Sequence, residues 1–160
     1  MFEAQTEWIA PDNFPDLSGY KFISIDLETR DPDLKSKGSG AVIGNGEIIG
    51  VAVAVDGWCK YYPFGHEGGG NLDKKKILSW VSDVCATEAT KIFHNAMYDI
   101  CWLRSYGIKV NGHIVDTMVM ASLVDENRMR YTLNALSWEY LGERKSEATL
   151  FEIAKNWGID

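Results

Sequence analysis

The sequence predicts an α/β fold in which a mixed sheet, an antiparallel meander followed by parallel strands, is flanked by helices. Two observations carry this prediction. Residues 21–62 contain three strand-like runs, and the turn-forming pair Asp56-Gly57 joins the second run to the third. From residue 71 onward, helical patterns alternate with short apolar runs. That alternation is typical of strands that pair in parallel through helical crossovers.

Length and composition indicate a single globular domain. The chain has 160 residues, of which 46% are hydrophobic, and its net charge is −7. The acidic balance argues against a broad basic surface for nucleic acid, although a site that holds phosphate through metal ions carries its positive charge in those ions. The three cysteines lack zinc-binding spacing. Neither a leader peptide nor a membrane-spanning run is evident, so we expect a cytoplasmic protein with no membrane partner.

We expect residues 1–19 to form an N-terminal arm with Trp8 and Phe14 as anchors, and residues 20–160 to form the domain itself. The arm is marked by two prolines and scattered acidic residues. Such a composition predicts an irregular lead-in segment.

Asp26 and Glu28 project together from the end of the first strand, which we expect over about Lys21 to Leu27. Side chains alternate between the faces of a strand, so the two acids share one face and Ile25 lies on the apolar face. Like charges held this close repel each other, and Mg²⁺ or Mn²⁺ is the natural neutraliser of an oxygen-only pair. The alternative is a strand end whose acids are simply solvated.

The other elements follow from turn signals and apolar periodicity. We expect a glycine-rich loop over residues 29–46, a hairpin of the strands Ile48 to Val55 and Trp58 to Tyr62, a helix from Asn71 or Asp73 to Cys85, a strand over Lys91 to His94, a helix that Asn95 opens and Gly107 ends, a strand over about Val110 to Val115, a helix from Thr117 through Val124, and helices over Thr132 to Leu141 and Ser146 to Trp157.

Asp99 is the residue placed to join the two strand acids. It lies early in the helix that Asn95 opens, inside an otherwise apolar run. Sites in such sheets form beyond the carboxyl ends of parallel strands, where Asp26 and Glu28 also lie if the Lys91 strand is their neighbour. The alternative is a surface acid that pairs with a nearby Lys or Arg.

Two segments together resemble a known family. Phe22 to Thr29 resembles the first motif, and His94 to Asp99 the second motif, of the DEDD-type 3′-to-5′ exonucleases. The pair Asp116-Thr117 and the segment Thr132 to Leu136 narrow the resemblance to the proofreading exonuclease domain of family A DNA polymerases, the polymerase I-like enzymes of bacteria and phages. The resemblance runs from about Phe22 to Trp157. It implies a ribonuclease H-like fold and two-metal hydrolysis of a DNA strand from its 3′ end.

The resemblance also implies roles for individual residues. Asp26 and Glu28 would bind the Mg²⁺ or Mn²⁺ ion that activates the attacking water, and Asp26 would bridge both ions. Asp99 would hold the second ion, which stabilises the leaving 3′ oxygen. The substrate-binding residues would be Leu27, Thr29 and Asn95. The partners implied are the 3′ end of single-stranded DNA and a polymerase domain in the parent protein.

Two further residues near the motifs receive structural roles. We interpret Asp116 as a helix N-cap rather than a metal ligand. For His94 we favour strand-end packing or a structural hydrogen bond over catalysis.

The family's third motif, Tyr-x-x-x-Asp or His-x-x-x-x-Asp, is missing up to Asp160. We therefore expect the domain to be truncated before its fourth carboxylate, to bind metal weakly and to hydrolyse DNA poorly or not at all. Two other functions stay open: a non-catalytic module of the same fold that binds DNA ends or protein, and a related exoribonuclease.

Overall fold

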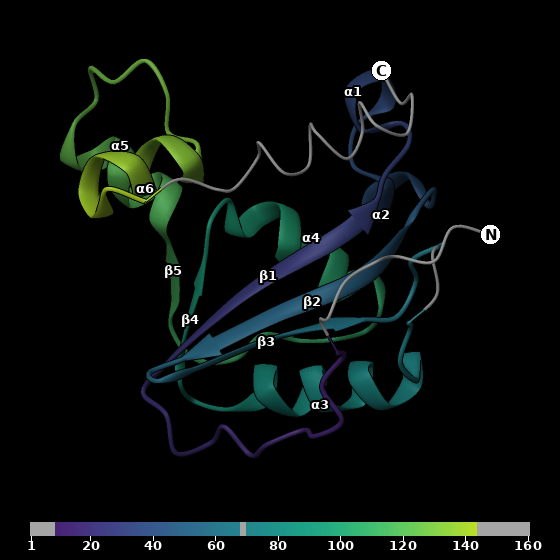
Figure 1. Cartoon of the computed structure of the whole chain (residues 1–160). Helices are drawn as coiled ribbons and strands as arrows, with labels where there is room; N and C mark the ends of the chain where they lie inside the picture. Colours follow the sequence, from purple (N-terminus) through teal and green to yellow (C-terminus); the bar gives the residue numbers. More distant parts are fainter. Residues whose placement is uncertain (1–8, 68–69, 144–160) are drawn as a thin grey trace. The chain divides into compact units, whose positions relative to one another are not determined.

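The computed structural model describes residues 9–67 and 70–143 of the chain. Its centre is a five-stranded sheet in the order β3-β2-β1-β4-β5 (Figure 1). The strands are β1 Phe22–Arg30, β2 Glu47–Val55, β3 Trp58–Pro63, β4 Thr90–Phe93 and β5 Ile114–Asp116. Strands β1, β2 and β3 pair antiparallel, whereas β4 pairs parallel with both β1 and β5. The predicted mixed sheet of a meander and parallel strands is therefore confirmed.

Six helices lie within the described residues: α1 Leu34–Lys37, α2 Gly40–Ile43, α3 Lys74–Ala86, α4 Ala96–Ser105, α5 Thr117–Val124 and α6 Leu133–Leu141. Helix α3 begins where we expected, because the Asp73 side chain accepts a hydrogen bond from the Lys76 N–H. The chain divides into two compact units, residues 1–117 with the sheet and residues 118–160 with most of α5 and with α6.

The core of the first unit lies on one face of the sheet. Alternate residues of β1 point into it, and Ile23 and Ile25 are only 0% and 2% exposed. Helices α3 and α4 supply the residues that cover this face, among them Ile77, Val81 and Leu103. Burying about five such side chains is worth roughly 10 kcal/mol of hydrophobic stabilisation. The opposite face of β1 carries Asp26 and Glu28.

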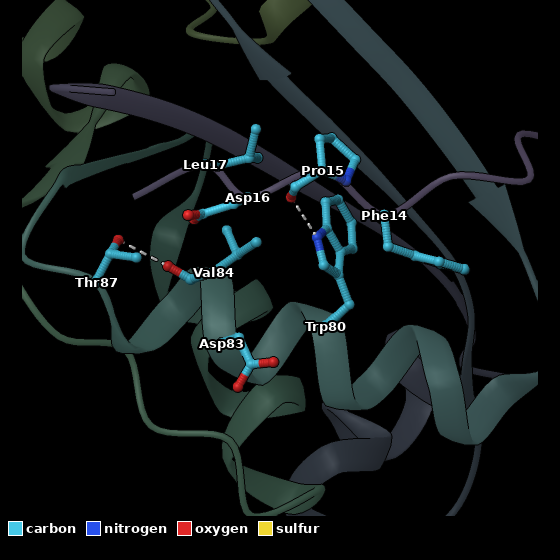
Figure 2. A pocket seen from close by; sticks show the side chains of 8 residues that line it. All are labelled: Phe14, Pro15, Asp16, Leu17, Trp80, Asp83, Val84 and Thr87. Carbon is cyan, nitrogen blue, oxygen red and sulfur yellow. Dashed lines mark hydrogen bonds between the residues drawn. The ribbon is translucent and has the colours of Figure 1, made fainter. Parts of the chain in front are cut away.

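The described part of the N-terminal arm packs against α3 and β3. Phe14 stacks on Tyr62 with ring centroids 5.3 Å apart, and the Trp80 Nε1–H donates to the Pro15 carbonyl over 2.8 Å. The arm and α3 line a pocket of about 250 Å³, and Figure 2 shows the side chains that line it. The expectation that Phe14 anchors the arm is confirmed. Trp8 lies outside the described residues.

Three predicted boundaries were wrong. Strand β1 continues to Arg30 because the chain resumes pairing with β2 after a bulge between Glu28 and Thr29. The expected loop over residues 29–46 contains the short helices α1 and α2. Strand β5 covers only three residues, because Gly112 adopts a φ of +77° that interrupts the extended backbone.

The second unit contains the predicted helix α6. The Thr132 side chain accepts from the Ala135 N–H at its start, and Gly142 ends it in a left-handed conformation. Arg128 bonds to the Glu139 carboxylate and to the Tyr140 hydroxyl within this unit. The predicted helix over Ser146 to Trp157 lies outside the described residues. Within the described part of the chain, helices long and apolar enough to cross a bilayer are absent.

Candidate active site

Asp26 and Glu28 lie on the exposed face of β1, as the alternation predicts. Both side chains are exposed, and the residues opposite them in β2 are Ala52 and Gly50. Neither residue has a side chain larger than a methyl group. A ligand or an ion can therefore reach the acids from this face.

Asp99 reaches β1 from helix α4 at a different point. Strand β4 pairs with β1 only from Phe22 to Ser24, so beyond Ser24 the backbone edge of β1 is not covered by β4. The Leu27 N–H on that edge donates to Asp99 Oδ1 over 3.0 Å, and the Asp99 side chain is only 4% exposed. The bond ties the second motif directly to the first.

The environment of Asp99 opposes its ionisation. Burial, helped by the negative charges of Asp26 and Asp116, raises the pKa of Asp99 to about 7, while the hydrogen bond from the Leu27 N–H acts in the opposite direction. The influence of Asp26 places the two carboxylates within electrostatic range of each other. A cation between them would relieve both the burial cost and the repulsion.

The start of α4 is built by residues that precede and follow it. Asn95 has a left-handed φ of +71°, and the carboxylate of Asp116 accepts the N–H groups of Asn95 and Ala96 over 3.0 and 2.8 Å. Asp116 thus caps a helix, as we interpreted it, although the helix that it caps, α4, precedes it in the sequence. His94 Nδ1 lies 2.9 Å from the Thr117 hydroxyl, which agrees with the structural hydrogen bond that we favoured.

The predicted substrate-binding residues occupy three different environments. The Asn95 side chain is exposed beside the start of α4. The hydroxyl of Thr29 lies 2.7 Å from that of Tyr98, which in turn donates to Asp31 over 3.0 Å. The Leu27 side chain is 7% exposed and belongs to the core, so it points away from the face that carries the acids.

Sequence reasoning missed Tyr61, which lies on the acid face. In the register of the hairpin, Tyr61 is opposite Ala52, and Ala52 is opposite Asp26. Burial and the charges of Glu28 and Asp26 raise the pKa of Tyr61 to about 12. The signal was available, because a two-residue turn at Asp56-Gly57 fixes which residues of the two strands lie opposite each other.

Asp26, Glu28 and Asp99 offer only oxygen ligands, which a divalent ion such as Mg²⁺ prefers. A cation would also offset the negative charges that act on Asp99. In the structure, however, their carboxylates do not come together as a set of three metal ligands. Across residues 9–67 and 70–143 no group of three His, Cys, Asp or Glu side chains is close enough to hold a metal ion. The structure therefore brings the three predicted residues to one region of β1 without forming a complete metal centre.

The sequence is similar to exonucleases and DNA polymerases. Residues 4–160 match the 3′-5′ exonuclease family of A-type DNA polymerases. A DNA-directed DNA polymerase of Pseudomonas phage M6 is 33% identical over 97% of this chain, and DNA polymerase DpoZ of Salmonella phage PMBT28 is 30% identical over 91%. These matches cover 24% and 21% of the two relatives, so the chain spans less than a quarter of their length.

Solved structures of nucleases share the fold. Brucella melitensis NrnC with bound Mg²⁺ has a TM-score of 0.59 and 18% identity, covering 86% of this chain and 61% of that one. Escherichia coli RNase D, an exoribonuclease, has a TM-score of 0.57 and 14% identity over 82% of this chain and 30% of that one. At these identities the likeness shows the fold alone, a ribonuclease H-like mixed sheet flanked by helices.

Proposed function

Because the chain belongs to the 3′-5′ exonuclease family of the family A DNA polymerases, we propose that it removes nucleotides from the 3′ end of a DNA strand as the proofreading domain of such a polymerase. Its polymerase partner would be part of the same parent protein, as in the phage relatives. The proposed substrate is a single-stranded 3′ end, the form in which a mismatched terminus leaves the duplex. The arm of residues 1–19 and the domain of residues 20–160 would together form this exonuclease unit.

The observation that carries the proposal is the hydrogen bond from the Leu27 N–H to Asp99 Oδ1. It joins residues 72 positions apart and holds a buried acid against the strand that bears Asp26 and Glu28. A buried carboxylate beside another carboxylate costs stability in the absence of a cation. Such an arrangement supports a role in binding metal rather than in stabilising the fold.

We assign Asp26, Glu28 and Asp99 as the residues that would hold Mg²⁺ or Mn²⁺. When bound, a pair of such ions would supply charge stabilisation for the attacking and leaving oxygens of an in-line displacement at phosphorus. Asp26, on the accessible face of β1, and Asp99, held by the Leu27 N–H, would each supply a carboxylate oxygen to such ions. Because Leu27 fixes one oxygen of Asp99, the other oxygen is left to act as a ligand.

The substrate would be held by residues on either side of the acids. Asn95 is exposed at the start of α4 and offers an amide to a sugar or phosphate oxygen. Thr29 and the backbone of Leu27 flank Glu28 on β1, where the terminal nucleotide would lie. The bond between the hydroxyls of Thr29 and Tyr98 would keep that end of β1 rigid.

Shortening of a 5′-labelled single-stranded DNA, followed with Mg²⁺ or Mn²⁺ and with chelator, tests the proposal. We expect only slow metal-dependent loss of 3′-terminal nucleotides, because the third motif of the family is missing up to Asp160, and Asp26→Ala should abolish this loss. Asp83→Ala, which removes an exposed acid from α3, is the matched control and should leave the rate unchanged. Equal rates for wild type and Asp26→Ala would contradict the assignment. A strand ending in a ribonucleotide, tested in parallel, would reveal an exoribonuclease if it were degraded faster.

A further inference from the structure

Tyr61 leans across β2 toward the acids of β1. The register places Gly50 of β2 directly opposite Glu28. A Cβ atom built on Gly50 would lie 1.9 Å from the Tyr61 hydroxyl oxygen and 2.5 Å from Cζ of its ring. The phenol therefore occupies the space that a side chain at residue 50 would fill, and its hydroxyl lies beside Glu28.

A glycine is needed at residue 50 for this close approach. Cβ atoms essentially never come within 3.0 Å of another heavy atom of this kind, so one of the two groups would have to move. Any other residue would push the phenol away from Glu28 or shift the backbone of β2. The strand interior thus accepts a residue with poor strand propensity where the Tyr61 ring crosses it.

His66 holds the Tyr61 hydroxyl. The Tyr61 hydroxyl and His66 Nε2 are hydrogen-bonded, and the two rings meet edge to face with centroids 5.9 Å apart. Asn71 holds the backbone of His66, because its amide accepts the His66 N–H over 2.8 Å and donates to the His66 carbonyl over 2.6 Å. Arg30, at the end of β1, donates to the Gly65 carbonyl over 3.3 Å.

We propose that Tyr61 is a positioning residue whose hydroxyl, held by His66, donates a hydrogen bond to the Glu28 carboxylate when that carboxylate binds a divalent ion. This inference rests on the proposed metal site. It requires the His66 ring to carry its proton on Nε2, so that the ring donates to the phenol oxygen and the phenol proton is left for Glu28. The bond would orient Glu28 toward Asp26 before the ion arrives.

The surroundings of the phenol favour donation. A phenol carries its proton at neutral pH, and the carboxylate of Glu28, opposite Gly50 in the register, can accept it in a hydrogen bond. Groups that hold a ligating carboxylate from behind typically change metal affinity by about 10-fold to 100-fold. If Tyr61 only packed the hairpin, its hydroxyl would have no effect on the ion.

Mn²⁺ binding to the full chain, measured from the electron paramagnetic resonance of the free ion, tests the proposal. We expect Tyr61→Phe, which keeps the ring and removes the hydroxyl, to weaken Mn²⁺ binding about 10-fold. Gly50→Ala should weaken it similarly by displacing the phenol, and the double variant should bind no more weakly than Tyr61→Phe alone. Circular dichroism would confirm that each variant is folded.

Tyr62→Phe is the matched control. Tyr62 is the next residue on β3, points into the core and donates its hydroxyl to the Asn13 carbonyl. This variant should bind Mn²⁺ as the wild type does. Wild-type binding that depends on Asp26 but is unchanged in Tyr61→Phe would overturn the inference and leave the proposed function standing. Wild-type binding that is unchanged in Asp26→Ala would overturn both.

Discussion

The two faces of strand β1 differ in the polarity and in the burial of their residues, although these residues alternate along the same short stretch of sequence. Ile23 and Ile25 point into the core and are almost fully buried, whereas Asp26 and Glu28 on the other face are exposed beside small residues of β2. Asp99 belongs with the second group by chemistry but with the first by burial. One strand can therefore stabilise the fold with one face and carry the proposed metal site on the other, and Asp99 is the residue at which the two requirements meet.

Truncation on the core face should cause the largest change in stability. We expect Ile25→Ala to lower the free energy of unfolding by about 2–5 kcal/mol, because a cavity replaces a side chain that is 2% exposed. Urea titration followed by circular dichroism measures this loss. Mn²⁺ affinity, measured well below the unfolding transition, should not change. A variant with normal stability and weakened Mn²⁺ binding would show that the two faces are not independent.

Asp99→Asn should change the pH dependence of stability in metal-free protein. Folding raises the pKa of Asp99 from the ordinary value of 3.8 to about 7. The folded state thus holds its proton more tightly than the unfolded state, so this contribution to stability is present below pH 3.8 and is lost as pH rises to about 7. The asparagine variant, whose amide oxygen can still accept the Leu27 N–H, lacks this loss.

The difference in unfolding free energy between Asp99→Asn and wild type should therefore grow by about 2–3 kcal/mol from pH 5 to pH 8. Urea titrations at the two pH values measure it, and Asp83→Asn on the exposed surface of α3 is the control. A difference that stays constant with pH would mean that Asp99 ionises as an ordinary surface acid does.

Removing Asp26 should have the smallest effect on stability. Its side chain is exposed, so we expect Asp26→Ala to change the unfolding free energy by no more than about 0.5 kcal/mol. The same variant should lower the pKa of Asp99, since the charge of Asp26 helps to raise it. Nuclear magnetic resonance titration of the Asp99 carboxyl would detect this change. An unchanged Asp99 pKa would place the two acids too far apart to share an ion.

The acid face was predictable because its signal is local. Alternation over seven residues of β1 separates acids from apolar residues, and the Asp56-Gly57 turn defines the hairpin. Asp99 was also found, since a charge within an apolar helical run is conspicuous. Its bond to Leu27 was not predictable, because it depends on β4 ending at Phe93 and leaving the edge of β1 open.

Features that depend on tertiary contacts could not be predicted from the sequence. The bulge after Glu28 lets β1 continue to Arg30, and the left-handed Gly112 shortens β5 to three residues. Asp116 precedes one helix in the sequence but caps another in space. In the sequence, Tyr61 is an aromatic residue of a strand like many others. Only the register, which places it opposite Ala52, shows that it lies beside the acids.

Mn²⁺ binding in wild type, Asp26→Ala and Asp99→Asn at pH 8 tests the proposed metal site. The claim is that acids from β1 and α4, which enter from an exposed face and from a buried edge, hold the same ion or ion pair. We predict that each variant weakens binding at least about 10-fold while remaining folded. Mn²⁺ affinity that falls in Asp26→Ala but stays at the wild-type value in Asp99→Asn would contradict the claim and reduce Asp99 to a structural residue.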